Sequence, residues 1–95
     1  LIMYQKPIKF LGKSGKLSSW YDGKFKGMIE TPDGVIAIKN NGDTYLNDEK
    51  IGNTKVSISN RMDSMGFCTY TLVGKFNGEN GETDSFSASN RMFIP

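Results

Sequence analysis

Apolar and polar residues alternate along most of this 95-residue chain, and this alternation restricts the fold more than any other feature. In "KVSIS" at 55–59 and "SFSAS" at 85–89, alternate positions carry the apolar side chains. A period of two places successive side chains on opposite faces of a strand, and no segment keeps helical spacing over three turns. The pattern therefore predicts an all-β protein with little helix.

Turn-forming residues recur about every 8–12 positions and divide the alternation into seven to eight short strands. Asp22-Gly23 lies between two apolar-bearing runs and predicts a two-residue hairpin turn, because both residue types accept positive φ. "TPDG" at 31–34 and "NNGD" at 40–43 are turns by composition. We also expect a flexible break at "GKSGK" (12–16), and either a longer loop or a single short helical turn at "NRMDSMG" (60–66).

These strands predict one domain over residues 1–95, folded as a small, strongly bent antiparallel barrel or as a sandwich. SH3-like and OB-like barrels are analogues of suitable size. The longest strand candidate is "FCTYTLVGKF" at 67–76, in which Gly74 indicates a bulge or a sharp bend.

The chain contains no histidine and a single cysteine, Cys68. The lack of histidine removes histidine-based acid–base catalysis, the Ser-His-Asp arrangement and most zinc sites. One cysteine cannot form a disulfide within the chain, and its place among strand residues predicts a buried structural thiol. We therefore expect a protein that is not an enzyme and that holds no cofactor and no metal.

Paired carboxylates are the catalytic device that a histidine-free chain retains. Most acidic residues lie at predicted turns; Glu30 and Asp84 lie on predicted strands, but nothing in the sequence brings them together. "NNGDTYLNDE" at 40–49 lacks the ligand spacing of a calcium loop, and "GKSGKLSS" at 12–19 lacks the phosphate-loop spacing.

Positive charge is concentrated in the first quarter of the chain. Residues 1–26 carry six lysines and one aspartate, a net charge of +5, whereas the other 69 residues carry six basic and nine acidic groups, a net charge of −3. Such a segment could steer an anionic partner, or its lysines could simply protect strand edges.

Two short phrases occur twice. "GKFKG" at 23–27 and "GKFNG" at 74–78 each place a phenylalanine between glycines. The two phenylalanines are either core residues at bends or exposed rings that stack a nucleobase beside lysines. "SISNRM" at 57–62 returns as "SASNRM" at 87–92, 30 positions later. The GKF pair is 51 positions apart, and these unequal spacings exclude a regular solenoid.

The SNRM phrases allow two interpretations. Two strands leave the sheet in the same way through asparagine, which accepts left-handed backbone angles. Alternatively, Arg61 and Arg91, the only arginines of the chain, sit at equivalent strand ends and bind phosphate through forked hydrogen bonds.

The sequence thus predicts a small barrel that recognises an anionic ligand, either single-stranded nucleic acid or a phosphorylated nucleotide. The predicted binding residues are Arg61, Arg91, Asn60, Asn90, Lys24, Lys26, Lys75, Trp20 and Tyr21.

The alternative is a protein–protein interaction module, such as a phage-type inhibitor or accessory protein acting on a host enzyme. No apolar run approaches the roughly 20 residues that span a bilayer, so we expect a cytoplasmic protein without a membrane partner. Self-association through sheet edges is compatible with both functions.

Overall fold

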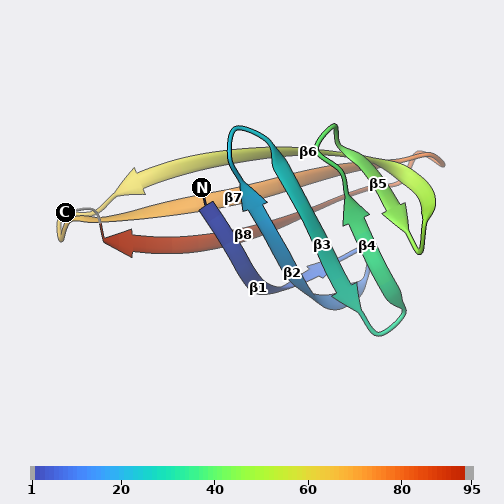
Figure 1. The fold of residues 1–95 in the computed structure, drawn as a ribbon, viewed down its shortest axis with the longest axis horizontal. Helices are drawn as coiled ribbons and strands as arrows, with labels where there is room; N and C mark the ends of the chain where they lie inside the picture. The colour runs from blue at the N-terminus through green and yellow to red at the C-terminus, as the bar shows by residue number, and fades with distance from the viewer. Residues whose placement is uncertain (1, 94–95) are drawn as a thin grey trace.

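The computed structural model describes residues 2–93, which form eight antiparallel strands and no helix (Figure 1). Residues 1, 94 and 95 of the predicted domain lie outside the described residues. Each strand pairs with the next in chain order, from the first to the eighth. The strands are β1 (Ile2–Phe10), β2 (Lys13–Tyr21), β3 (Phe25–Thr31), β4 (Gly34–Ile38), β5 (Asp43–Leu46), β6 (Glu49–Met62), β7 (Phe67–Gly78) and β8 (Thr83–Phe93). The prediction of an all-β protein is confirmed.

The sheet curls into a nearly closed barrel, so that β1 returns to the neighbourhood of β8. Among residues 2–93 no backbone ladder joins these two strands. Hydrogen bonds that each use one side chain bridge the seam instead. Two of them reach β8, from Leu11 N to Asp84 Oδ2 (2.6 Å) and from Asn90 Nδ2 to the carbonyl of Met3. The third crosses the seam to β7, from Tyr4 Oη to the carbonyl of Tyr70 (3.0 Å).

Three phenylalanines from both sides of the seam meet in the barrel core. Phe10 packs edge-to-face on Phe76, with ring centroids 5.6 Å apart, and on Phe86 at 5.1 Å. All three side chains are buried, as the alternation requires of inward-facing positions. Gly74 lies directly opposite Phe86, and a Cβ at Gly74 would collide with the Phe86 ring. The glycine therefore permits close packing under an aromatic ring.

The turns differ from the sequence prediction. Asp22-Gly23 is not a two-residue turn: the β2–β3 connection has three residues, and only Gly23 has positive φ, at 75°. Two-residue turns with positive φ at both positions occur at Leu11-Gly12 (54° and 73°) and Asn47-Asp48 (48° and 69°). Leucine rarely adopts positive φ, so residue type did not reveal the first of these turns.

Two segments that the sequence predicted to lie between strands belong to strands in the structure. Residues 13–16 of the expected break at 12–16 belong to β2 and pair with β1, and Asn60–Met62 of the expected loop belong to β6. The prediction of short strands is also wrong for β6, β7 and β8, which contain 14, 12 and 11 residues. The far ends of these three strands reach past β1 (Figure 1), and residues 59–71 and 89–93 are called the β6–β8 extension. At its base, Tyr70 and Asn90 still form hydrogen bonds with β1. The molecule accordingly measures 44 × 24 × 19 Å.

Candidate functional site

The repeated SNRM phrases lie on either side of β7, in the same register. Ser57 and Ser87 are both opposite Val73, and Arg61 and Arg91 are both opposite Thr69. Directly opposed residues of antiparallel strands project from the same face of a sheet. Both arginines therefore project from one face of the β6–β8 extension.

Asn60 and Asn90 occupy the neighbouring row, where both are opposite Tyr70. Because side chains alternate along each strand, this row projects from the face opposite the two arginines. The four residues that the repeat made into one predicted site are therefore divided between two faces of the extension.

Arg91 is already engaged by neighbouring residues at the tip of the extension. Its Nη2 and Nε donate to Asp63 Oδ2 at 2.6 and 3.1 Å, and its guanidinium lies 4.0 Å from the centroid of the Phe67 ring. The hydrogen bond from Arg91 is the largest cause that lowers the pKa of Asp63 below its ordinary value. Arg61 is exposed and joins no ion pair with another described residue.

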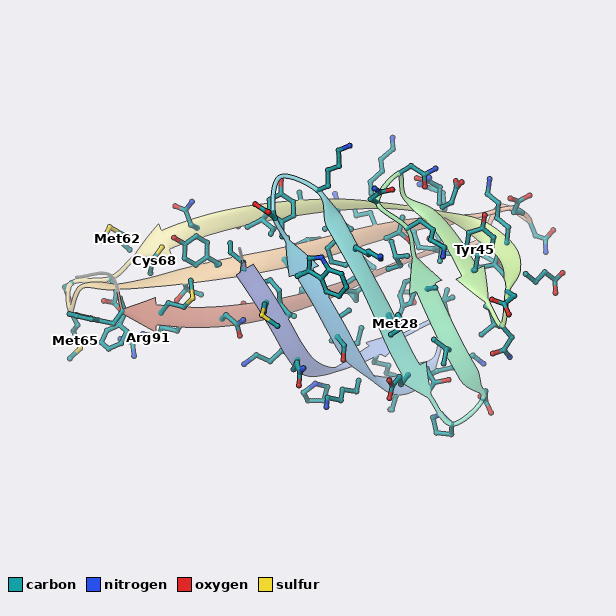
Figure 2. The ribbon with its side chains drawn as sticks, in the orientation of Figure 1. Met28, Tyr45, Met62, Met65, Cys68 and Arg91 are labelled. Carbon is teal, nitrogen blue, oxygen red and sulfur yellow. The ribbon has the colours of Figure 1, made fainter. Side chains whose placement is uncertain are left out.

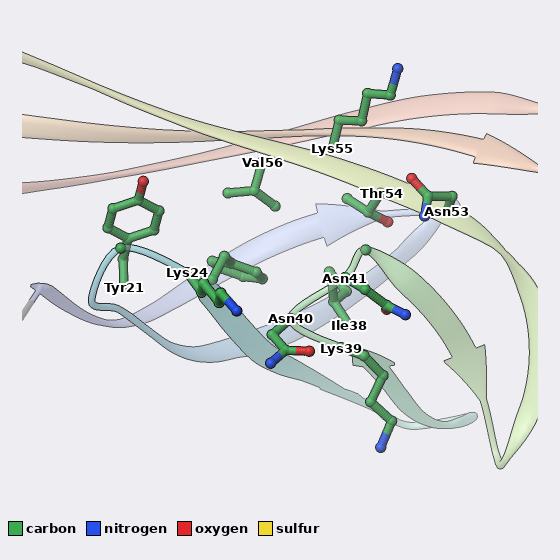
Figure 3. Close-up of a pocket in the computed structure, with 13 residues that line it drawn as sticks. Tyr21, Lys24, Ile38, Lys39, Asn40, Asn41, Asn53, Thr54, Lys55 and Val56 are labelled. Atoms are coloured by element: carbon green, nitrogen blue, oxygen red, sulfur yellow. The ribbon is translucent and has the colours of Figure 1, made fainter.

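A hollow of about 380 Å³ opens at one end of the barrel, between the β2–β3 connection, the β4–β5 turn and β6 (Figure 3). We call it the basic mouth. Its lining contains three lysines and no carboxylate. The lining residues are Tyr21, Gly23, Lys24, Phe25, Ile38, Lys39, Asn40, Asn41, Gly42, Asn53, Thr54, Lys55 and Val56.

The side chains of the basic mouth are arranged around an open rim. In Figure 3 Lys24 and Asn40 lie on the near side of the hollow, whereas Lys39 and Lys55 extend away from it in different directions. Tyr21 stands at the other end of the rim, near Val56. Amides and the stems of the lysines thus line the opening, while the ammonium groups of Lys39 and Lys55 lie outside it on a wider surface.

Of the other hollows with lysine in their lining, the one at Lys9 and the one at Lys26 and Lys39 contain no acid, whereas two others do. Lys75 lines one together with Asp84, and Lys50 lines another together with Asp43 and Glu79. In the second of these, Lys50 Nζ lies 3.3 Å from Asp43 Oδ1. Three lysines without a carboxylate line the basic mouth, compared with two in the hollow at Lys26 and Lys39 and one in the hollow at Lys9.

Lys75 nevertheless lies beside the basic mouth, because it is the direct cross-strand partner of Lys55. Like charges opposite one another in a sheet destabilise it. Neither lysine forms an ion pair with another residue in the described part of the chain. An anion between the two ammonium groups would relieve this repulsion.

Trp20 and Lys26 are cross-strand partners on the outer face of the β2–β3 hairpin. Lys26 Nζ lies 5.5 Å from the centroid of the Trp20 ring, and the Trp20 side chain is 43% exposed. The hairpin therefore presents an aromatic ring and a cation on its outer face, while Tyr21 and Lys24 line the basic mouth.

The structure brings together part of the predicted set. Trp20, Tyr21, Lys24 and Lys26 share one hairpin, and Lys75 joins this region through Lys55. The two SNRM phrases lie instead on the β6–β8 extension. The lysines and asparagines of the lining that were not predicted from the sequence are Lys39, Asn40, Asn41, Asn53 and Lys55. Lys39 directly precedes the predicted "NNGD" turn. If the strands are assumed to run up and down in chain order, this turn and the turn at Asp22 lie at the same end of the sheet, so this assumption would have brought Lys39 near Lys24.

Two other side chains with reactive groups, Asp84 and Cys68, are part of the barrel's own bonding and packing. Asp84 accepts the seam hydrogen bond from Leu11 N, and Cys68 is buried. The Cys68 thiol, through a hydrogen bond with the Tyr70 hydroxyl, raises the pKa of Tyr70. Across residues 2–93, no three His, Cys, Asp or Glu side chains gather where they could hold a metal ion.

The same residues include no helix of the length and apolar character needed to cross a membrane. Comparisons with protein-family models, curated proteins and solved structures find no match to this chain.

Proposed function

We propose that this protein is a non-enzymatic binding protein that holds a phosphate-bearing ligand, single-stranded nucleic acid or a phosphorylated nucleotide, at the basic mouth. One observation carries the proposal: Lys24, Lys39 and Lys55 line a hollow that has no carboxylate in its lining. Uncompensated charge of one sign in a concave surface concentrates ions of the opposite sign. Phosphate groups are the anions that lysine commonly binds in proteins.

The chemistry of the rim suits several phosphate oxygens at once. Each lysine offers three donors, and the amides of Asn40 and Asn53 offer more, whereas Asn41 Nδ2 already donates to Asp43 Oδ2 at 3.2 Å. Lys55 and Lys75, opposite one another, extend the positive surface along β6 and β7. Arg61 and Arg91 lie outside this proposed site, and Arg91 already bonds to Asp63.

A charge-matched pair of variants tests the proposal. Fluorescence anisotropy with a labelled single-stranded oligonucleotide and calorimetry with a nucleoside triphosphate measure the two ligand types. We expect K24Q/K39Q/K55Q to weaken binding at least 10-fold, while K9Q/K16Q/K50Q, with the same loss of charge elsewhere, binds nearly as the parent protein does. Equal weakening in both variants, or no binding of either ligand by the parent protein, contradicts the proposal.

A second candidate function is a protein–protein interaction module, such as an inhibitor or accessory protein acting on a host enzyme. Exposed apolar side chains on the outer face favour it: Met3 and Trp20 are cross-strand partners, 57% and 43% exposed, and Met28 is 45% exposed. Aromatic and methionine side chains are enriched in interfaces. Co-purification of the parent protein and of a W20A/M28A variant tests this function; a partner retained equally by both contradicts a role for this face.

A further inference from the structure

A second hollow, of about 300 Å³, lies on the outer face of β2, β3 and β4. We call it the Trp20 hollow. Trp20 and Met28 project outward beside it, and Ala37 is the direct partner of Met28 on the next strand. The full lining is Trp20, Lys26, Gly27, Met28, Ala37, Ile38 and Lys39. The surface of the hollow is mostly apolar, with two lysines and no carboxylate among its residues.

Each of these two lysines lies against an aromatic ring. Lys26 Nζ is 5.5 Å from the Trp20 centroid, and Lys39 Nζ is 5.8 Å from the centroid of Tyr45, which is the cross-strand partner of Ala37. Figure 2 shows Met28 and Tyr45 over this side of the barrel. Aromatic surface, a thioether and two cations therefore stand side by side on one face.

The Trp20 hollow and the basic mouth meet at Ile38 and Lys39, which line both. A ligand that alternates charged and flat apolar groups can occupy the two hollows together. Inorganic phosphate or a polyphosphate chain matches the lysines but has no group that matches Trp20 and Met28. A nucleic acid strand has both kinds of group, and its bases stack on exposed aromatic rings without regard to sequence.

We propose that the ligand of this barrel is single-stranded nucleic acid and that one base sits in the Trp20 hollow, stacked against the indole. Its flanking phosphates lie on Lys26 and Lys39, and the strand continues into the basic mouth at Lys24. This inference rests on the proposed function, because Lys39 serves both hollows. It adds the class of ligand and the residues that contact a base.

Trp20 is the only tryptophan of the chain, so intrinsic fluorescence reports directly on this hollow. The probes are an oligothymidine, an abasic oligonucleotide of the same length and inorganic polyphosphate. We expect oligothymidine to quench Trp20 to saturation. The abasic strand and polyphosphate should bind at least 10-fold more weakly, with little quenching, because they cannot stack.

Variants of the hollow separate stacking from charge. Measured by fluorescence anisotropy of labelled oligothymidine, W20A should weaken binding about 10-fold or more, whereas W20F keeps an aromatic ring and should lose less. M28A should weaken binding, while M65A, an equivalent truncation at the exposed tip of the β6–β8 extension, should not. Circular dichroism establishes that each variant is folded.

The two proposals fail in different ways. Equal affinity for oligothymidine, the abasic strand and polyphosphate, without quenching, overturns the base-binding inference and leaves the phosphate-binding function standing. Equal effects of M28A and M65A also overturn it. If none of the three probes binds, the base-binding inference is overturned; if the nucleoside triphosphate does not bind either, the proposed function is overturned as well.

Discussion

Arg61 and Arg91 are both direct antiparallel partners of Thr69, one on each side of β7. The six-residue repeat follows this arrangement throughout: Ile58 and Ala88 flank the buried Leu72, just as the two arginines flank Thr69. The interval of 30 residues is the chain path through β7 and its two connections. Two strands that share a partner face the same neighbours, and this shared environment accounts for the resemblance without a tandem repeat.

The contact between Arg91 and Asp63 predicts a change in proton binding. The hydrogen bond from Arg91 lowers the pKa of the folded Asp63 below the ordinary 3.8, so the pair stabilises the tip above that pH and its contribution is lost as the pH falls. We expect R91Q to raise the pKa of Asp63 toward 3.8, measured by carbon NMR of the carboxyl group. R61Q is the control, since Arg61 forms no ion pair with another described residue; an equal rise in both variants contradicts the assignment.

The approach of Gly74 to Phe86 predicts a loss of stability on adding one methyl group. A Cβ at Gly74 would overlap the Phe86 ring, and overpacking a core lowers the free energy of unfolding by about 1–3 kcal/mol. Urea denaturation of G74A measures this loss. In an F86L background, where the ring is absent, the same change should be less destabilising. G74A as stable as the parent protein would show that the two residues do not pack as described.

The seam predicts a specific effect of removing one hydroxyl group. Y4F deletes the donor to the carbonyl of Tyr70 and should lower the free energy of unfolding by about 0.5–1.5 kcal/mol. Burial also raises the pKa of Tyr4, so folding favours the neutral phenol, and stability decreases as the pH rises above 10. Y4F should show a shallower decrease than the parent protein. Y45F serves as the control; the same loss in both variants would argue against a role for the seam bond.

Much of the fold could be predicted because it depends on local pattern. Alternation predicted that Leu72 and Phe76 share one face, and both are buried. The bulge predicted as one possibility at Gly74 is wrong, because this residue pairs in unbroken register with Val56 and Phe86. The strand at residues 13–16 could not be predicted, because its glycine and polar residues are strand-like only when paired with β1. Closure of the barrel depends on Leu11 and Asp84, 73 residues apart, which no local pattern connects.

In the candidate site, too, some residues could be predicted from the local sequence, whereas others depend on how the strands are arranged. Trp20, Tyr21, Lys24 and Lys26 were predictable, because one hairpin holds them all. Lys39 and Lys55 come from other strands and reach the basic mouth only through the order of the sheet. The face of the sheet on which each residue of the two SNRM phrases lies could be determined only from the register of β6, β7 and β8.

The salt dependence of oligonucleotide binding tests the central claim most directly. Each phosphate neutralised on a single strand contributes about −0.7 to the slope of the logarithm of affinity against the logarithm of salt concentration. If Lys24, Lys39 and Lys55 each meet one phosphate, K24Q/K39Q/K55Q should have a slope about 2 units less steep than the parent protein. The control K9Q/K16Q/K50Q should keep the parent slope. A slope unchanged in the first variant, or reduced equally in both, would contradict phosphate binding at the basic mouth.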